Sequence, residues 1–566
     1  MLTPEIEKRL TTIIAWGALV VTLLVTDRVS VDAANVGKMV VLAVTAGSSL
    51  VILVGLHKKL MLNSRLIVAL NSCFLAMALF STIFSSDPWE KGFYGTYGRS
   101  TGFLTYFSLS ILFIAATQLH RTENYLRIIR VLLLAGSINL IYCLFAANGV
   151  DIFTWENPYG KVLGTFGNPN FISSFMGIFF TTLCSLFFAE SIKYLHRIFI
   201  FVCGVGSLYV IIKTGSQQGG VVAAGGLAIV FFFFLRSKFK NHWVSFSYLT
   251  GIALVGFISI AGMLQKGPLS AILYKESVSL RGEYWHAGLN MGFANPFFGV
   301  GLGSFGTFYR EFRNESATIL PGVNTISDAA HNIYIDIFAS TGLLGAIFYI
   351  AINILVLIQA IGFIKSHPKF DPIFVLLFSA WVAYQAQAII SINQIGLAVW
   401  GTVLGGLLFG YTRKTDLGLS KVAEFSLANL FKVKKASEGK EVTAGIALGN
   451  FAGGMVFLLL SAPNFYADIA LRQGLTSNSP EKLFAVAKLF PLDSNRINFI
   501  ASKLSQGGIN EQSVSLIRIG LDKFPNNFDL LFSQFQIYAP GSTEKREIGK
   551  RLHLADPFNP TYFEYR

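Results

Sequence analysis

Residues 328–345 read DAAHNIYIDIFASTGLLG, a segment that begins polar and ends apolar. This change predicts that His331 lies at the edge of a membrane-spanning helix. An ionisable side chain at a membrane boundary is costly, so a functional role is its usual explanation, provided that substrate reaches that side of the membrane. The number and direction of the spans decide on which side of the membrane His331 lies.

The composition predicts a membrane protein built from helices. Hydrophobic residues make up 53% of the 566 residues and charged residues only 13%, too apolar a balance for an ordinary soluble protein. Because a span needs roughly 17 to 25 apolar residues, we predict an all-α, polytopic fold with thirteen spans, twelve of them in a core. The predicted spans are residues 11–26, 38–56, 65–84, 102–119, 127–147, 169–189, 197–213, 218–235, 243–264, 342–364, 371–391, 395–412 and 442–461.

The positive charges predict the direction of these spans. Lys and Arg gather in every second connection, and such connections are usually cytoplasmic. The clusters are Lys58, Lys59 and Arg65; Arg121, Arg127 and Arg130; Lys193 and Arg197; Arg236, Lys238 and Lys240; Lys365 and Lys369; and Arg413, Lys414, Lys432, Lys434 and Lys435. The N-terminus is then cytoplasmic and the C-terminus extracytoplasmic. Most of the net charge of +14 is explained by Lys and Arg residues that anchor the cytoplasmic connections to the membrane. No nucleic-acid partner is therefore implied.

This topology divides the chain into four parts. Residues 1–412 form the membrane core, which includes a long outer loop at about residues 265–341. A basic cytoplasmic linker follows at 413–441, the last span at 442–462, and an extracytoplasmic tail at 463–566.

The tail contains a weak internal repeat. Phe490-Pro491 and Phe524-Pro525 lie 34 residues apart, with a pattern of paired helices between them. This period resembles that of tetratricopeptide repeats, whose stacked units bind peptides or proteins. The alternative is an irregular helical tail with chance prolines. If the repeat is real, it indicates a protein partner without identifying it.

Topology also separates the eight histidines. Five fall in cytoplasmic connections beside Lys and Arg, and only His286, His331 and His553 face outward. His331 is followed by Asn332, by nine further residues, and then by the pair Gly342 and Gly345. Small residues allow a membrane helix to pack closely against its neighbours, and helix packing alone is a sufficient explanation of these glycines.

Arginine on the outer face also needs a reason, because membrane topology depletes it there. Arg99 precedes the fourth span, and Arg281 lies in the long outer loop. A forked guanidinium suits the oxygens of a phosphate or diphosphate. Arg310 and Arg313 have Glu311 and Glu315 close by in sequence, so we expect them to form surface ion pairs or to contact lipid headgroups.

A third outer feature is the turn Gly167-Asn168-Pro169-Asn170 at the start of the sixth span. Gly, Pro and Asn favour a rigid turn that presents backbone amides and a helix N-terminus. Such a turn suits an anion or sugar hydroxyls, although helix capping explains it equally well.

Together these residues resemble the O-antigen ligase superfamily. It comprises lipopolysaccharide O-antigen ligases, O-antigen polymerases and protein O-oligosaccharyltransferases of bacterial membranes. The resemblance covers about residues 10–412 and rests on the turn Gly167–Asn170, Arg281 in the long loop, the segment Asn295–Gly301, and His331-Asn332 with the later glycine pair.

The resemblance implies glycan transfer from an undecaprenyl-diphosphate carrier to an acceptor hydroxyl on the outer face of the bacterial plasma membrane. It implies no nucleotide sugar, cofactor or metal. By position, Arg281 corresponds to the arginine that engages the diphosphate, and His331 to the essential histidine, which accepts or orients the hydroxyl proton. The acceptor is a glycolipid such as lipid A core, a growing glycan, or a protein.

Two departures from the family pattern concern the arginines. The ligases have Arg-x-x-x-Leu, but the fourth residue after Arg281 is Trp285. The family often has Ser-Arg-Gly near the eighth span, where this chain has Ser216-Gln217-Gln218-Gly219. Arg99 is the candidate replacement for the missing arginine.

Three alternatives stay open. Glu283 and Asp328 are other candidate bases. Each is more commonly a loop residue or a helix cap, and Asp328 would orient His331 if that segment were helical. Asp87 and Glu90 would suit a metal-dependent transferase, although a hard cation usually needs more oxygen ligands. A transporter fits the many spans, but the two halves show no inverted repeat.

Overall fold

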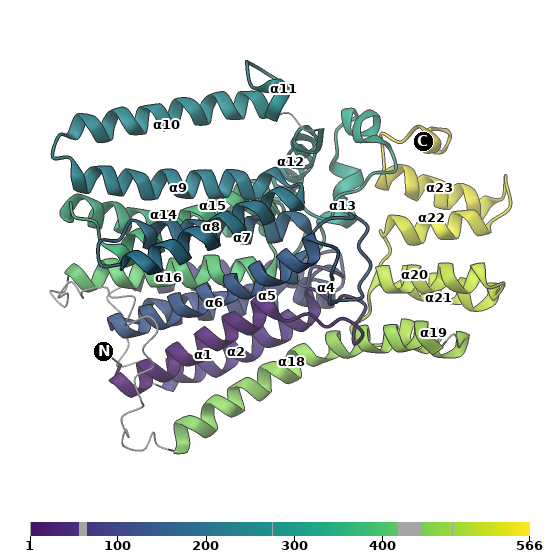
Figure 1. The fold of residues 1–566 in the computed structure, drawn as a ribbon. Helices are drawn as coiled ribbons and strands as arrows, with labels where there is room; N and C mark the ends of the chain where they lie inside the picture. Colours follow the sequence, from purple (N-terminus) through teal and green to yellow (C-terminus); the bar gives the residue numbers. More distant parts are fainter. Residues whose placement is uncertain (1, 56–64, 274–275, 417–443, 478) are drawn as a thin grey trace.

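The computed structural model describes residues 2–55, 65–273, 276–416, 444–477 and 479–566 (Figure 1). The predicted all-α class is confirmed, because the secondary structure of this part is helical throughout. A long helix is present at each predicted span. These helices are α1 (Pro4–Leu23), α2 (Val36–Gly55), α3 (Arg65–Phe84), α5 (Phe103–Thr117), α6 (Thr122–Ala147), α7 (Pro169–Phe187), α8 (Tyr194–Thr214), α9 (Gln217–Lys238), α10 (His242–Met263), α14 (Ile333–Ser366), α15 (Pro372–Ile390), α16 (Ile395–Asp416) and α18 (Ala444–Ser477).

Eleven helices in the described part are long and apolar enough to cross a membrane. The protein is therefore a multi-pass membrane protein. Of the other two long helices, α5 has only 15 residues, and α1 has Glu5 and Glu7 in its first turn. The count of thirteen spans stays a prediction for this reason.

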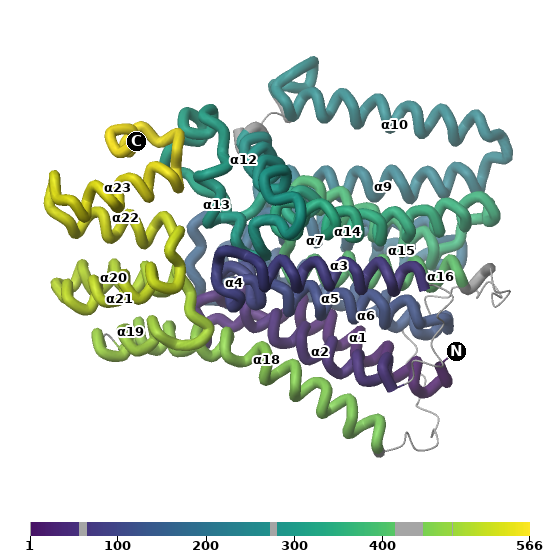
Figure 2. The backbone as a smooth tube through the Cα atoms, turned by 180° about the vertical axis from the view of Figure 1, so that it is seen from behind, coloured from purple at the N-terminus to yellow at the C-terminus, as the bar shows by residue number. Residues whose placement is uncertain are grey.

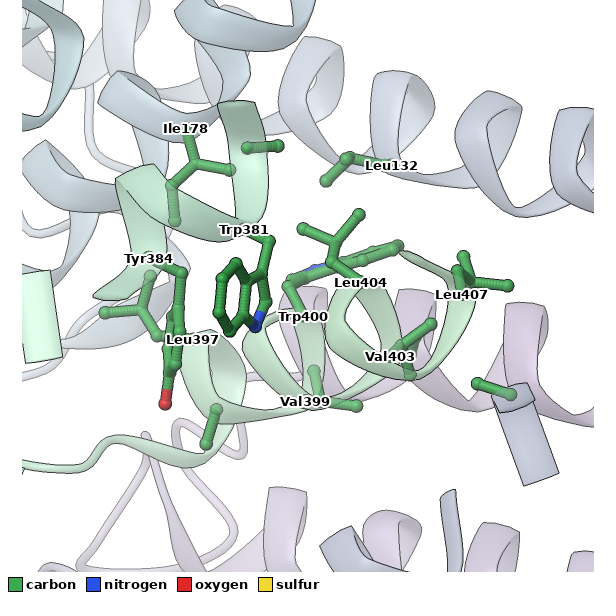
Figure 3. Close-up of a cluster of buried hydrophobic side chains, with 14 of the residues drawn as sticks. Leu132, Ile178, Trp381, Tyr384, Leu397, Val399, Trp400, Val403, Leu404 and Leu407 are labelled. Carbon is green, nitrogen blue, oxygen red and sulfur yellow. The ribbon is translucent and has the colours of Figure 1, made fainter. Parts of the chain in front are cut away.

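The centre of the bundle is aromatic and apolar. Trp381 and Tyr384 of α15 lie against Trp400 of α16, among leucine and valine side chains (Figure 3). The indole N–H of Trp400 donates a hydrogen bond to Thr22 Oγ1 of α1 at 2.7 Å. A polar N–H buried in a membrane bundle needs such a partner, so this bond fixes α16 against α1.

The helices of the loops between the spans lie with the tail at one end of the bundle, opposite the N-terminus (Figures 1 and 2). The loop elements are α4 (Trp89–Tyr94), η3 (Gly164–Phe166), α11 (Ser270–Leu273), α12 (Glu276–Ala294), α13 (Phe305–Phe312) and η4 (Thr318–Gly322). This grouping agrees with the predicted outer loops, while the side of the membrane stays a prediction. Residues 417–443, most of the predicted linker, and Lys58 and Lys59 lie outside the described residues.

The tail has its own hydrophobic core and consists of helical hairpins. Its helices are α19 (Pro480–Ala487), α20 (Ser494–Gln506), α21 (Asn510–Lys523), α22 (Phe528–Ile537), α23 (Thr543–Ala555) and η5 (Pro560–Tyr565). Asp493 caps α20 and Asn527 caps α22. The two caps lie 34 residues apart, each two residues after Pro491 or Pro525. The tetratricopeptide assignment itself stays a prediction.

The tail is joined to the outer loops by charged and polar contacts. The carboxylate of Asp556, at the end of α23, is fully buried and lies 2.8 Å from Nη2 of Arg313 and 3.3 Å from Nη1 of Arg310. Lys523 lies 3.2 Å from Glu90 of α4. The expectation of surface ion pairs or headgroup contacts for the two arginines was wrong. Arg313 is only 1% exposed, because its partner comes from the distant tail.

The entry of α14 into the bundle depends on Gly342. Its φ of 72° and ψ of −173° interrupt the helix, and this conformation is essentially restricted to glycine. The kink lets the loop backbone approach, so that Leu343 N–H donates to Pro296 O at 2.8 Å and Val300 N–H to Ala339 O at 2.9 Å. The predicted close packing at this glycine is confirmed, with a loop as its neighbour. The helix begins at Ile333, before the predicted span.

We predict that Gly342→Ala destabilises the protein by about 1–3 kcal/mol from backbone strain alone. The added Cβ would also lie 2.6 Å from Pro296 O. The measurement is thermal unfolding of the purified protein in detergent. Gly362→Ala is the matched control, because it lies in the same helix and its Cβ would meet no atom within 4 Å. Equal melting temperatures for the two variants would contradict this role of the kink.

Candidate functional site

A small hydrophobic core positions the residues around His331. It joins α12, α13 and the start of α14 and consists of Ala287, Met291, Val300, Phe305, Tyr309, Ala330 and Ala339. Gly288 lets α12 lie close to α14, since a Cβ there would be 2.8 Å from Ile335. This core fixes the side of α12 that carries Arg281 next to the segment that carries His331.

The backbone at His331 is held on both sides. Asn332 caps α14 by accepting hydrogen bonds from the N–H groups of Tyr334 and Ile335 at 3.0 and 3.2 Å. Asp336 accepts one from the N–H of Ala330 at 3.0 Å. Between them His331 has a φ of 54°, a left-handed conformation that costs about 1–3 kcal/mol and occurs most often at functional sites. The supporting residue Asn332 therefore orients His331 through the backbone.

Asp328 pairs with Arg99, which brings the first outer loop to the site. Nε and Nη2 of Arg99 donate to Oδ2 and Oδ1 of Asp328 at 2.6 and 3.2 Å. The segment before His331 is not helical, so Asp328 neither caps the helix nor orients the ring from one helical turn away. Burial alone would raise the pKa of Asp328, but the charge and hydrogen bonds of Arg99 hold it below its usual value.

Arg281 lies near His331 and has no carboxylate partner in the described ranges. It is half-buried, and burial lowers the pKa of its guanidinium, although an arginine stays charged in a protein. Among the side chains that the structure describes, Arg281 forms no ion pair or hydrogen bond. Its strongest electrostatic neighbour besides His331 is the Tyr284 ring. An uncompensated, partly desolvated cation is a favourable place for an anion.

His331 is held in its neutral form by this environment. Burial, and then the charge of Arg281, lower the pKa of His331 to about 4, while Asp328 acts in the opposite direction. The ring lies 5.4 Å from that of Tyr284. Within the described part of the chain the imidazole makes no hydrogen bond, so a neutral ring nitrogen is available to accept a proton.

The turn at residues 167–170 is linked to Arg99 through Tyr159. Gly167 has a left-handed φ of 69°, and Asn168 caps α7. Asn168 also donates to the hydroxyl of Tyr159 at 3.1 Å, and Tyr159 interacts electrostatically with Arg99. Asn170 instead accepts from Ser216 at 2.7 Å, at the start of α9. Among these described contacts, it is therefore Asn168 that connects the turn to Arg99.

The other candidate acids have partners of their own. Glu283 accepts a hydrogen bond from Ser316 at 2.9 Å. Asp87 lies 2.7 Å from the amino group of Lys91, and Glu90 is paired with Lys523 of the tail. Neither carboxylate of the Asp87–Glu90 segment is therefore free of a cation.

Three residues of this site were not predicted from the sequence to be functional. Tyr284 lies three residues after Arg281 and was hidden in an aromatic segment. Tyr159 lies in an outer loop without a motif. The position of Asp336 could have been recognised from the sequence, because an acidic residue in the first turn of a helix often accepts a hydrogen bond from a backbone N–H.

A comparison with known protein families finds a match over the region that contains His331 and Arg281. Residues 201–350 match the family model described as O-Antigen ligase. The matched segment contains Arg281, Asp328 and His331, whereas Arg99 and the turn at 167–170 lie outside it. It supports glycosyl transfer of the ligase or polymerase type in general. The chain has no match among the curated proteins.

We predict that His331 titrates with a pKa of about 4, well below the usual 6.5. The measurement is NMR titration of the purified protein with ¹³C-labelled histidine, and the signal is assigned by its loss in His331→Ala. Arg281→Gln should raise the titration midpoint, because it removes a positive charge that disfavours imidazolium. A midpoint near 6.5 in the unmodified protein would contradict this description of the site.

Proposed function

We propose that the protein transfers a glycan from an undecaprenyl-diphosphate carrier to an acceptor hydroxyl at the outer face of the bacterial plasma membrane. The N-terminus then lies in the cytoplasm, and the site and tail lie outside. The observation that carries the proposal is the guanidinium of Arg281, which has no carboxylate partner among the described residues, beside the neutral imidazole of His331. This arrangement supplies the two things that the reaction needs, a cation for a diphosphate and a base for a hydroxyl.

Arg281 and Arg99 have different parts in this proposal. Arg281 is free of any described carboxylate, so it engages the diphosphate directly and stabilises the charge that develops as the carrier leaves. Arg99 has two of its nitrogens on Asp328 and keeps Nη1 for a second phosphate contact. This division supports Arg99 as the replacement for the arginine missing at Gln217.

The proposed step is a substitution at the sugar carbon attached to the carrier. The acceptor oxygen bonds to that carbon, the bond from the carbon to the diphosphate oxygen breaks, and the hydroxyl proton passes to His331. Because the carrier diphosphate is already a leaving group, positioning and charge neutralisation supply most of the catalysis. The proposal therefore assigns no role to a metal or cofactor.

The acceptor is a glycolipid such as lipid A core, a growing glycan, or an exported protein, and each gives different products. A ligase changes the glycan on lipid A core, a polymerase changes chain length, and an oligosaccharyltransferase changes glycoproteins. Mass spectrometry of these three fractions in a strain without its own copy of the protein separates them.

We predict that His331→Ala lowers glycan transfer by about 10²- to 10⁴-fold, the usual contribution of a general base. The same strain, complemented with each variant, gives the measurement. Expression and membrane insertion should not change, because the side chain makes no hydrogen bond within the described residues. His286→Ala is the matched control, since His286 is exposed on the same outer face. Wild-type transfer by His331→Ala would remove His331 from the mechanism.

A further inference from the structure

A polar pocket lies where the tail meets the outer loops. We call it the junction pocket. Its lining includes Lys91, Thr307 and Arg310 from the loops and Asn495, Asn527 and Asp529 from the tail. The space inside it, including the opening to solvent, is about 550 Å³.

The junction pocket adjoins the candidate site. Thr96, Gly303 and Asp328 line both this pocket and the hollow that contains Arg99. Asp328, whose carboxylate pairs with Arg99, thus lines both spaces. Residues of the tail line this pocket in addition to Asp328, the partner of Arg99. A substrate that extends outward from the membrane would meet the tail here.

The cations of the junction pocket are already neutralised. Arg310 is paired with Asp556, donates to Val323 O at 2.7 Å, and lies over the Phe528 ring at 4.1 Å. Lys91 is paired with Asp87 and also contacts Thr307. A phosphate would therefore meet no free positive charge in this pocket, in contrast to the surroundings of Arg281.

The free groups of the pocket are a carboxylate and amides. Asp529 makes no ion pair or hydrogen bond in the described part of the chain. Burial raises the pKa of its carboxyl, while Arg310 acts in the opposite direction. Asn495 is exposed and likewise without a described partner, and the side-chain oxygen of Asn527 caps α22, which leaves its amide N–H₂. A carboxylate accepts hydrogen bonds from hydroxyls, and an amide both donates and accepts.

We propose that the junction pocket binds a sugar residue of the glycan being transferred or extended, with Asp529 accepting hydrogen bonds from its hydroxyls. This inference rests on the proposed glycan transfer and names a substrate contact within the tail. The tail is then part of the substrate site. Donor and acceptor glycans share this chemistry, so the experiment tests them separately.

The test measures binding of two oligosaccharides to full-length protein in detergent by saturation-transfer NMR. One is released by mild acid from the lipid-linked glycan of the native strain, and the other from the finished product. All variants carry His331→Ala, so that binding is measured without turnover. Asp529→Asn should weaken binding about tenfold, since it removes a charged acceptor, and Asn495→Ala should also weaken it. Asp522→Asn, exposed on α21, is the matched control and should bind normally.

Loss of binding of the first oligosaccharide assigns the pocket to the donor, and loss of the second assigns it to the acceptor. Unchanged binding in both Asp529→Asn and Asn495→Ala, or no binding to the parent protein, would overturn the inference. Failure of the proposed function would give a different result. The unmodified protein would then show no glycan transfer, while the oligosaccharide would still bind and Asp529→Asn would still weaken that binding.

Discussion

The site depends on the half-buried guanidinium of Arg281, which has no carboxylate partner in the part of the chain that the structure describes. Partial removal of a cation from water costs free energy unless an opposite charge approaches it. The described groups that interact electrostatically with Arg281 include Tyr284 and His331, and neither is an anion at neutral pH. The same cation helps to keep His331 unprotonated. One charge therefore makes the site attractive to a diphosphate and leaves the adjacent imidazole able to accept a proton.

The surrounding structure holds these two groups in place from several elements. The kink at Gly342 lets a loop bind α14, the Asn332 cap and Asp336 fix the backbone at His331, and Asp328 secures Arg99. The buried contact of Asp556 with Arg310 and Arg313 attaches the tail to the same loops. Because buried ion pairs gain little over apolar packing, this contact is better explained by the specific position that it gives the tail beside the site.

The sequence was informative where the physical signal is local. Each long apolar run predicted from the sequence is a helix in the described part, and the turn at residues 167–170 has its predicted cap. Pairings between residues that are far apart in the sequence could not be predicted. Asp328 meets Arg99, 229 residues away, and Arg313 meets Asp556, 243 residues away. Neighbouring glutamates suggested surface pairs for Arg313, which was wrong because its partner Asp556 comes from the tail. The spacing suggested that Asp328 orients His331 if that segment is helical, and the structure shows that it is not helical.

The central claim is that Arg281 forms a diphosphate site, and ligand-induced stabilisation tests it most directly. A ligand that binds only the folded protein raises its melting temperature. Farnesyl diphosphate, a short isoprenyl diphosphate, should raise the melting temperature of the unmodified protein and of Arg518→Gln, whose arginine is exposed on α21. The rise should disappear in Arg281→Gln. An equal rise in Arg281→Gln and in the unmodified protein would contradict the account.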